Sequence, residues 1–138
     1  MESRGLHKSA QGQSIVEFAL VLPLLLIIIV GVFDLGRAFF ALITINNAAR
    51  EGARYATLHL DETVANIQTV AANEAQGSGL IVMTSDVFVS CPDDGVAFPC
   101  NPGTAVRVTV RYTFRSLLNF IIQSQFIMQR SIEMAVPK

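Results

Sequence analysis

Two cysteines, Cys91 and Cys100, are the residues of this chain whose type and spacing most directly permit chemistry. They enclose the segment CPDDGVAFPC, whose Pro, Gly and Asp residues favour a loop. Oxidation would join the two thiols and close this short loop as a disulfide, which is stable in an oxidising compartment. The alternative is a pair of unrelated small apolar residues. A metal site is not indicated, because no further cysteine or well-placed histidine supplies the remaining ligands.

Constellations typical of enzymes are not evident in the rest of the chain. The sequence offers no Ser/His/Asp or Cys/His set, no paired-carboxylate site, no phosphate-binding glycine loop and no metal cluster. Asp93 and Asp94 are adjacent within the cysteine loop, and we interpret them as turn residues, because calcium would need several more oxygen ligands. We therefore expect neither an enzyme nor a bound cofactor.

An apolar segment near the N-terminus explains why 51% of the 138 residues are hydrophobic. Residues 18–33 (FALVLPLLLIIIVGVF) carry no charge. Extension to Ile15 and Leu35 gives about 20 residues, enough to cross a bilayer as a helix. We expect a transmembrane helix over residues 13–35, with a kink or loosened turn at Pro23. A buried helix of a soluble protein is the alternative, but about 100 other residues could hardly cover a helix that is apolar all round.

The charges on the two sides of this segment indicate its direction. Arg4 and Lys8 precede the apolar run, whereas Asp34 and Arg37 follow it and cancel. Because basic residues tend to stay on the cytoplasmic side, we expect the N-terminus inside the cytoplasmic membrane and the C-terminal domain outside it. A disulfide in the C-terminal half fits the same direction.

The residues before the apolar run differ from a secretory signal peptide. A polar leader, residues 1–12 (MESRGLHKSAQG), ends at Gly12, and Glu17 stands at the very edge of the apolar run. No small-residue cleavage site closes that run, so we expect the helix to be retained. Taken alone, Glu17 could be a simple interfacial carboxylate.

The segment GQSIVEF, residues 12–18, resembles the leader junction of class III (type IV) prepilins. In that family a membrane peptidase cuts after the glycine on the cytoplasmic side, here between Gly12 and Gln13, and leaves a glutamate, here Glu17, at the fifth mature position. The apolar helix then anchors the subunit in the membrane and, after extraction, packs in the core of a filament. There the N-terminal ammonium group of a neighbouring subunit could neutralise Glu17 and favour one axial register.

A longer stretch is similar to the TadE-like family of pilin-like proteins, which is associated with tight-adherence (Flp-type) pilus machinery. The matching features are Gly12, VEFA at 16–19, Pro23, the pair Asp34 and Arg37, and AREGAR at 49–54. The resemblance implies a minor pilin-like subunit (pseudopilin) whose partners are the membrane, a prepilin peptidase, and other subunits of a pilus or related secretion machinery. An uncleaved single-span protein with an extracytoplasmic partner-binding or scaffold domain is the alternative.

The helical pattern continues beyond the apolar segment. We expect one helix from about Ser14 to about Thr57, in which residues 36–60 extend outside the membrane. One stripe of this helix consists of Leu35, Phe39, Leu42, Asn46, Ala49 and Ala53, at spacings of three or four. Arg50, Glu51 and Arg54 form a charged face, which is either a docking face, for the domain's sheet or for a neighbouring subunit, or a solvated helix face.

Residues 61–138 have the pattern of a small extracytoplasmic α+β domain. Asp61 is a candidate N-cap for a short helix that ends before Gly77, with a stripe of Val64, Ile67, Ala71 and Ala75. The period then changes to two, which predicts strands over residues 80–91, 106–115 and 125–136. The expected inward residues are Val106, Val108, Val110, Tyr112 and Phe114, then Phe126, Met128, Ile132 and Met134. The fold class is therefore α+β: a long N-terminal helix, a short second helix and a small antiparallel three-stranded sheet, as in pilins.

Two further features of the domain allow more than one interpretation. Arg107, Arg111 and Arg115 could bind a polyanion, but threonines separate them and no aromatic platform accompanies them. With a net charge of −1, this favours a solvated strand face, and we expect no nucleic-acid partner. The apolar segment 116–124 (SLLNFIIQS) either closes the core as a helical turn, which we favour, or rests on the membrane or a neighbouring subunit.

Overall fold

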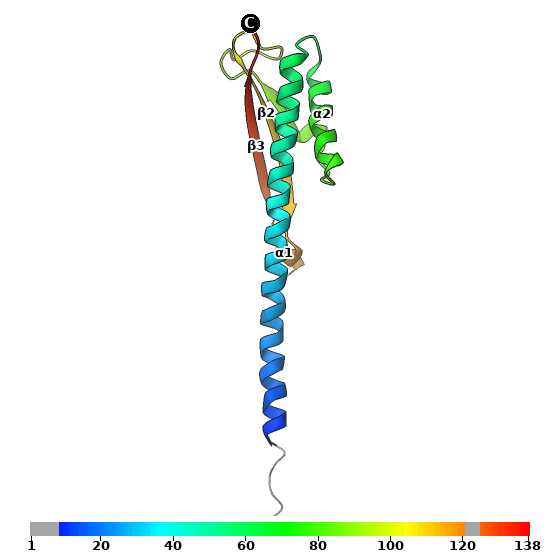
Figure 1. The fold of residues 1–138 in the computed structure, drawn as a ribbon, viewed down its shortest axis with the longest axis vertical. Coiled ribbons are helices and arrows are strands. Elements are labelled where there is room, and N and C mark those ends of the chain that lie inside the picture. Colours follow the sequence, from blue (N-terminus) through cyan, green and yellow to red (C-terminus); the bar gives the residue numbers. More distant parts are fainter. Residues whose placement is uncertain (1–8, 121–124) are drawn as a thin grey trace, which may run out of the picture.

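A single long helix, α1 (Ser9–Leu58), runs through the computed structural model, which describes residues 9–120 and 125–138. The N-terminal half of α1 projects alone, and a small domain packs on its C-terminal half (Figure 1). The helix begins earlier than the expected Ser14, continues through Pro23 and ends one residue beyond Thr57. The predicted α+β class is confirmed.

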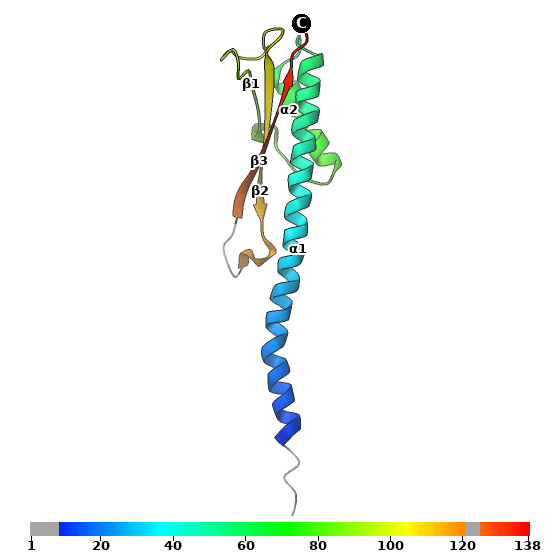
Figure 2. The same ribbon diagram turned by 60° about the vertical axis from the view of Figure 1, so that its left-hand side comes forward.

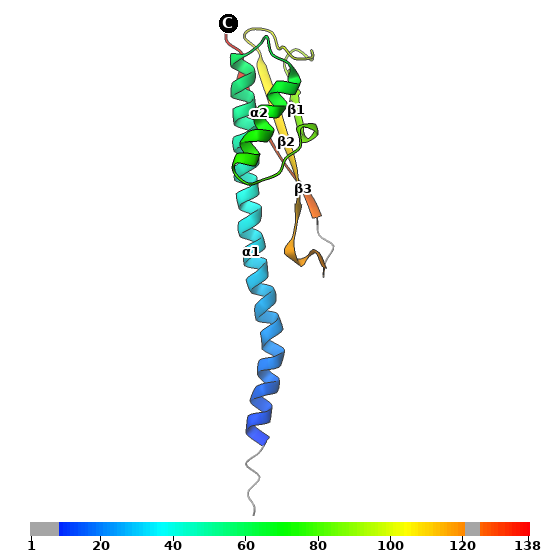
Figure 3. The same ribbon diagram turned by 90° about the vertical axis from the view of Figure 1, so that its right-hand side faces the viewer.

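The second helix, α2 (Val64–Gly77), lies beside the C-terminal part of α1 (Figure 3). The prediction that Asp61 is its N-cap is wrong. Thr63 takes that position, because its hydroxyl oxygen lies 3.3 Å from the Asn66 amide and accepts its hydrogen bond. The predicted stripe largely holds, since its buried members are Ile67, Ala71 and Ala75.

Three strands form one antiparallel sheet in the order β1-β2-β3. They are β1 (Val87–Ser90), β2 (Ala105–Arg115) and β3 (Gln125–Ala135), and Figure 2 shows them beside α1. In the middle of the sheet Val110 lies opposite Val87 on one side and opposite Arg130 on the other. β2 and β3 end within one residue of their predicted bounds.

The first strand is much shorter than the predicted 80–91. Burial still alternates before it: Leu80 and Val82 are buried, and Ile81 and Met83 are exposed. These residues nevertheless pair with no strand, because the chain turns through a short 3-10 helix, η1 (Thr84–Asp86), before it enters β1. Alternation therefore identified an extended segment here, but not a hydrogen-bonded one.

The sheet faces follow the predicted pattern except at one end. In β2 the side chains of Val106, Val108, Val110 and Phe114 are buried, and Tyr112 is half-buried. In β3 Met128 is buried, whereas Ile132 and Met134 are half-buried. Phe126 was also expected inward, but 48% of it is exposed, because it lies at the end of the sheet nearest the projecting part of α1.

The face of α1 that packs on the domain consists mostly of small residues, and the predicted stripe holds only in its C-terminal part, where Ala49 and Ala53 are buried. Leu35 and Phe39 are exposed, and the buried positions are Ala41, Thr44, Ile45, Ala48, Ala49, Gly52, Ala53 and Ala56. A Cβ placed on Gly52 would lie 3.0 Å from the Ala71 Cβ and 3.2 Å from the Val108 Cγ1. Because Gly52 lacks this atom, α1 can approach both α2 and β2 closely.

Candidate functional site

The projecting part of α1 presents apolar side chains in every direction. The helix is long and apolar enough to cross a membrane, and none of its most apolar window is buried. Ile15 and Phe33, near the two ends of this surface, are 69% and 66% exposed. Since a helix that is apolar all round is favourable in lipid and unfavourable in water, this arrangement fits a location in a membrane.

The predicted cleavage site and Glu17 lie close together at the N-terminal end of α1. Gly12 and Gln13 are exposed, and a Cβ placed on Gly12 would meet nothing within 4 Å. The side chain of Gln13 donates a hydrogen bond from Nε2 to Oε1 of Glu17, at 3.0 Å. Glu17 is exposed, so its carboxylate is accessible to a partner. The basic residues that predict the direction of insertion, Arg4 and Lys8, lie outside the described residues.

At the other end of the apolar surface, Asp34 connects α1 to the domain. The side chain is buried, and its Oδ2 accepts hydrogen bonds from the Ser116 hydroxyl and, at 2.7 Å, from the Leu117 amide. Both donors lie at the start of the 3-10 helix η2 (Leu117–Phe120), which follows β2. A carboxylate from α1 thus caps a helical turn more than 80 residues away in the chain.

Arg37 completes this junction from the next turn of α1. Its Nη1 donates to Oδ1 of Asp34 at 3.0 Å, and its guanidinium lies 5.4 Å from the centre of the Phe114 ring. The carboxylate therefore has a charged partner and two donors from the domain, which makes its burial favourable. The sequence points to Asp34 and Arg37 as a pair. It gives no sign that Ser116 joins them, although a serine before an apolar run is a typical helix-capping signal.

The described part of the segment after β2 does not join the core, which the sequence favoured for this segment. Its described part is a helical turn, η2, but Leu117 is 50% exposed and belongs to no buried cluster. The reason is the bond to Asp34, which holds the turn beside α1 and beyond the end of the sheet. The remainder of the predicted segment, residues 121–124, lies outside the described residues.

Two of the three residues of the charged face of α1, Glu51 and Arg54, form an ion pair. Arg54 binds Glu51 through Nη2–Oε1 at 2.5 Å and Nε–Oε2 at 2.8 Å, and Arg50 is exposed beside them. The Arg54 hydrogen bonds hold the pKa of the Glu51 carboxyl below its ordinary value, and Glu51 in turn raises the pKa of Arg54. Both arginines are exposed outside the core. The buried contacts of this part of α1 are made by the neighbouring Gly52 and Ala53.

The cysteine loop is closed as predicted. Cys91 and Cys100 form a disulfide with a Cα–Cα distance of 5.4 Å. Asp93 accepts a hydrogen bond from the Ala105 amide at 2.9 Å, and Asp94 accepts one from the Asn101 amide at 3.0 Å. Both acids thus bind the segment that follows the cysteine loop. No cluster of metal-ligating side chains occurs among the described residues.

Two arginines of the predicted basic stripe already have partners in the chain. Arg107 binds Glu133 on the neighbouring strand, with Nη2–Oε1 at 2.5 Å. Arg111 lies over the Phe88 ring, 4.3 Å from its centre. These intramolecular contacts support the interpretation of a solvated strand face.

Comparison with curated proteins and with solved structures gives no match. One family model does match, and it covers the segment that contains Gly12, Glu17, Asp34 and Arg54. It points to a Tad pilus-related protein of a structural rather than enzymatic kind. Residues 12–54 match the model described as TadE-like protein, which confirms the resemblance predicted from this part of the sequence.

Proposed function

We propose that the protein is a minor pilin-like subunit of a tight-adherence (Flp-type) pilus or a related secretion machinery. The observation that carries this proposal is the bare apolar surface of α1 over residues 15–33, which the domain does not cover. This surface lies within residues 12–54, which match the family model. In the membrane this surface would contact lipid. After extraction it would contact the same surface of other subunits.

The proposed organisation has four parts. Residues 1–12 are a leader on the cytoplasmic side, and residues 13–35 cross the membrane. Residues 36–60 extend the helix outside, and residues 61–138 form the extracytoplasmic domain. The disulfide supports this direction, because such a bond persists in an oxidising compartment.

Processing by a prepilin peptidase is the second element of the proposal. The cut would fall between Gly12 and Gln13, one helical turn before Glu17. It would create an ammonium group on Gln13 and remove the polar leader that otherwise prevents the helix from leaving the membrane. In an assembly that ammonium group could pair with Glu17 of a neighbouring subunit, and mispaired registers would leave both charges in an apolar environment. Arg50, Glu51 and Arg54 are a proposed docking face for another subunit.

The test is intact mass and N-terminal sequencing of protein recovered from membranes. Cells with an active prepilin peptidase should give a chain that begins at Gln13, and cells with an inactivated peptidase should give the full chain. Gly12→Ala should block the cut, whereas Gly31→Ala, within the span, should leave it unchanged. A full chain from cells with active peptidase would contradict the proposal and leave the uncleaved membrane-anchored scaffold.

A further inference from the structure

We propose that the domain contacts the membrane a second time, independently of the span, through an apolar patch beside the Asp34 junction. The patch consists of Leu117 in η2 and of Phe126 and Ile127 on the two faces of β3 at its start, and is called the junction patch below. Its partner is the outer surface of a phospholipid bilayer. This inference rests on the proposed insertion of α1 with the domain outside.

The contacts of Asp34 with Ser116 and Leu117 determine where along α1 the patch lies. The Leu117 amide lies 2.7 Å from Oδ2 of Asp34, so η2 is level with Asp34. Asp34 lies between Phe33 and Leu35, which are exposed and stand at the C-terminal end of the proposed span, residues 13–35. Figures 2 and 3 show the orange segment after β2 beside α1, well beyond the end of the sheet. When residues 13–35 cross the membrane, η2 therefore lies at the lipid–water boundary.

The side chains of η2 and of the adjoining start of β3 are those expected of a lipid contact. Leu117 is 50% exposed and Ile127 is 69% exposed. Phe126 is half exposed, and its ring packs at a tilt against Phe114 of the core, with 5.2 Å between the ring centres. A groove of about 230 Å³, lined by Gly31, Leu35 and Phe126 among others, connects Phe126 of the patch with the span. The apolar surface of α1 thus continues onto the domain.

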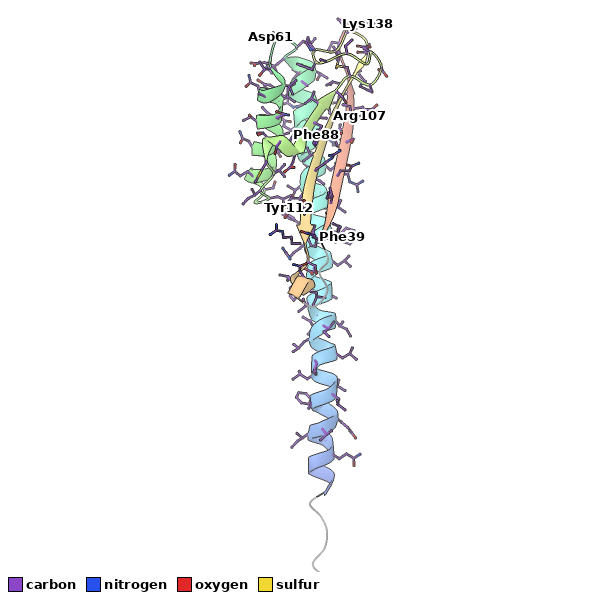
Figure 4. The ribbon with its side chains drawn as sticks, turned by 180° about the vertical axis from the view of Figure 1, so that it is seen from behind. Phe39, Asp61, Phe88, Arg107, Tyr112 and Lys138 are labelled. Atoms are coloured by element: carbon purple, nitrogen blue, oxygen red, sulfur yellow. A yellow bond between two sulfur atoms is a disulfide. The ribbon has the colours of Figure 1, made fainter. Side chains whose placement is uncertain are left out.

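The charged residues near the junction patch also fit a lipid surface. The half of the sheet next to the patch, residues 110–115 and 125–130, contains Arg111, Arg115 and Arg130 and no carboxylate. Arg115 and Arg130 are exposed and have no ion-pair partner within the described ranges. Acidic Asp61 lies at the opposite end of the domain (Figure 4). Cations above an apolar patch fit the phosphate groups of lipids.

A lipid surface is the favoured occupant because the patch is continuous with residues that the span already places in lipid. A second protein would have to displace lipid from both surfaces at once. The contact would fix the domain's orientation against the membrane before any assembly.

The absence of tryptophan from the chain permits a direct test. Single Trp reporters are placed at Ile127→Trp and Leu117→Trp in the junction patch. Phe33→Trp reports on the span, and Val96→Trp, in the distal cysteine loop, reports on a site away from lipid. The full chain is reconstituted at low density in phosphatidylcholine–phosphatidylglycerol vesicles. Quenching by lipids brominated close to the headgroup is then measured, and circular dichroism and an intact disulfide verify each variant.

The proposal expects both patch reporters to be quenched to a similar extent as Phe33→Trp, and several times more than Val96→Trp. Strong quenching at Phe33→Trp with patch reporters that behave like Val96→Trp would overturn the second contact and leave the span intact. Blue-shifted patch reporters that lipids do not quench would overturn it in favour of a second protein copy. If Phe33→Trp itself is not quenched, both this contact and the proposed membrane anchoring are wrong.

Discussion

The amide of Leu117 donates a 2.7 Å hydrogen bond to the side chain of Asp34, although the two residues are 83 positions apart in the sequence. This bond and that of Ser116 to the same carboxylate join the domain to α1 at the end of the helix segment that projects alone. The sheet is therefore attached to α1 near both of its ends, by Gly52 at one and by Asp34 at the other. Such an attachment opposes rotation of the domain about the helix.

Removal of the Asp34 carboxylate should loosen η2. In Asp34→Ala the Leu117 amide loses its acceptor, so hydrogen exchange over residues 116–120 should accelerate, and Ser116→Ala should have a smaller effect in the same direction. The measurement is hydrogen-exchange mass spectrometry in detergent micelles. Glu74→Ala removes an exposed carboxylate from α2 and is the matched control. Unchanged exchange in Asp34→Ala would show that the junction does not hold the turn.

Gly52→Ala should destabilise the domain. A new methyl group would meet the Ala71 Cβ and Val108 Cγ1 at 3.0 and 3.2 Å, and α2 would have to shift. Overpacking of this kind costs about 1–3 kcal/mol, which exceeds the gain of about 1 kcal/mol from replacing glycine within a helix. Gly36→Ala is the control in the same helix, because nothing lies within 4 Å of its added Cβ. Denaturant unfolding in micelles should show a loss for Gly52→Ala and none for Gly36→Ala.

Local patterns predicted the elements of this fold, but not the contacts between them. The strict alternation of apolar and polar residues in β2 predicted which of its side chains are buried, because a side chain on a strand points to one of only two faces. The predicted helical stripe was wrong at Phe39, which is exposed, because the buried face of α1 consists mostly of small residues that allow the domain to approach. The bond between Asp34 and Ser116 could not be predicted, since neither residue type indicates a partner 82 positions away.

Loss of the disulfide should weaken the domain without altering the span. The bond between Cys91 and Cys100 closes a loop with a sequence separation of 9. In the chain-entropy account such a closure contributes about 2–4 kcal/mol, because it restricts the unfolded chain. The double variant Cys91→Ser/Cys100→Ser should unfold at lower denaturant concentration than the oxidised protein. The reduced wild-type protein should behave like the variant, and equal midpoints for all three would contradict the prediction.

The ion pair on α1 should make stability depend on pH in the acid range. Arg54 lowers the folded-state pKa of Glu51 below its ordinary 4.5, so the stabilisation is complete above the unfolded-state pKa. It is lost as pH falls through the lowered folded-state value. Glu51→Gln should therefore reduce stability at neutral pH and show a smaller further loss on acidification than the wild type. Parallel unfolding curves for the two proteins between neutral and acid pH would exclude this contribution.

Glu17 should govern assembly rather than insertion or processing. Its carboxylate is exposed at the start of the apolar surface and accepts a hydrogen bond from Gln13, the residue that the proposed cut would make N-terminal. Glu17→Val and the isosteric Glu17→Gln both remove the charge that would pair with the neighbouring ammonium group. We expect both variants to insert and to be cut after Gly12, but to be lost from sheared surface filaments or from crosslinked complexes. Leu25→Val, an exposed apolar position in the same helix, should assemble normally. Normal incorporation of Glu17→Gln would remove the register role from this residue, because that variant differs from the wild type in charge and not in shape.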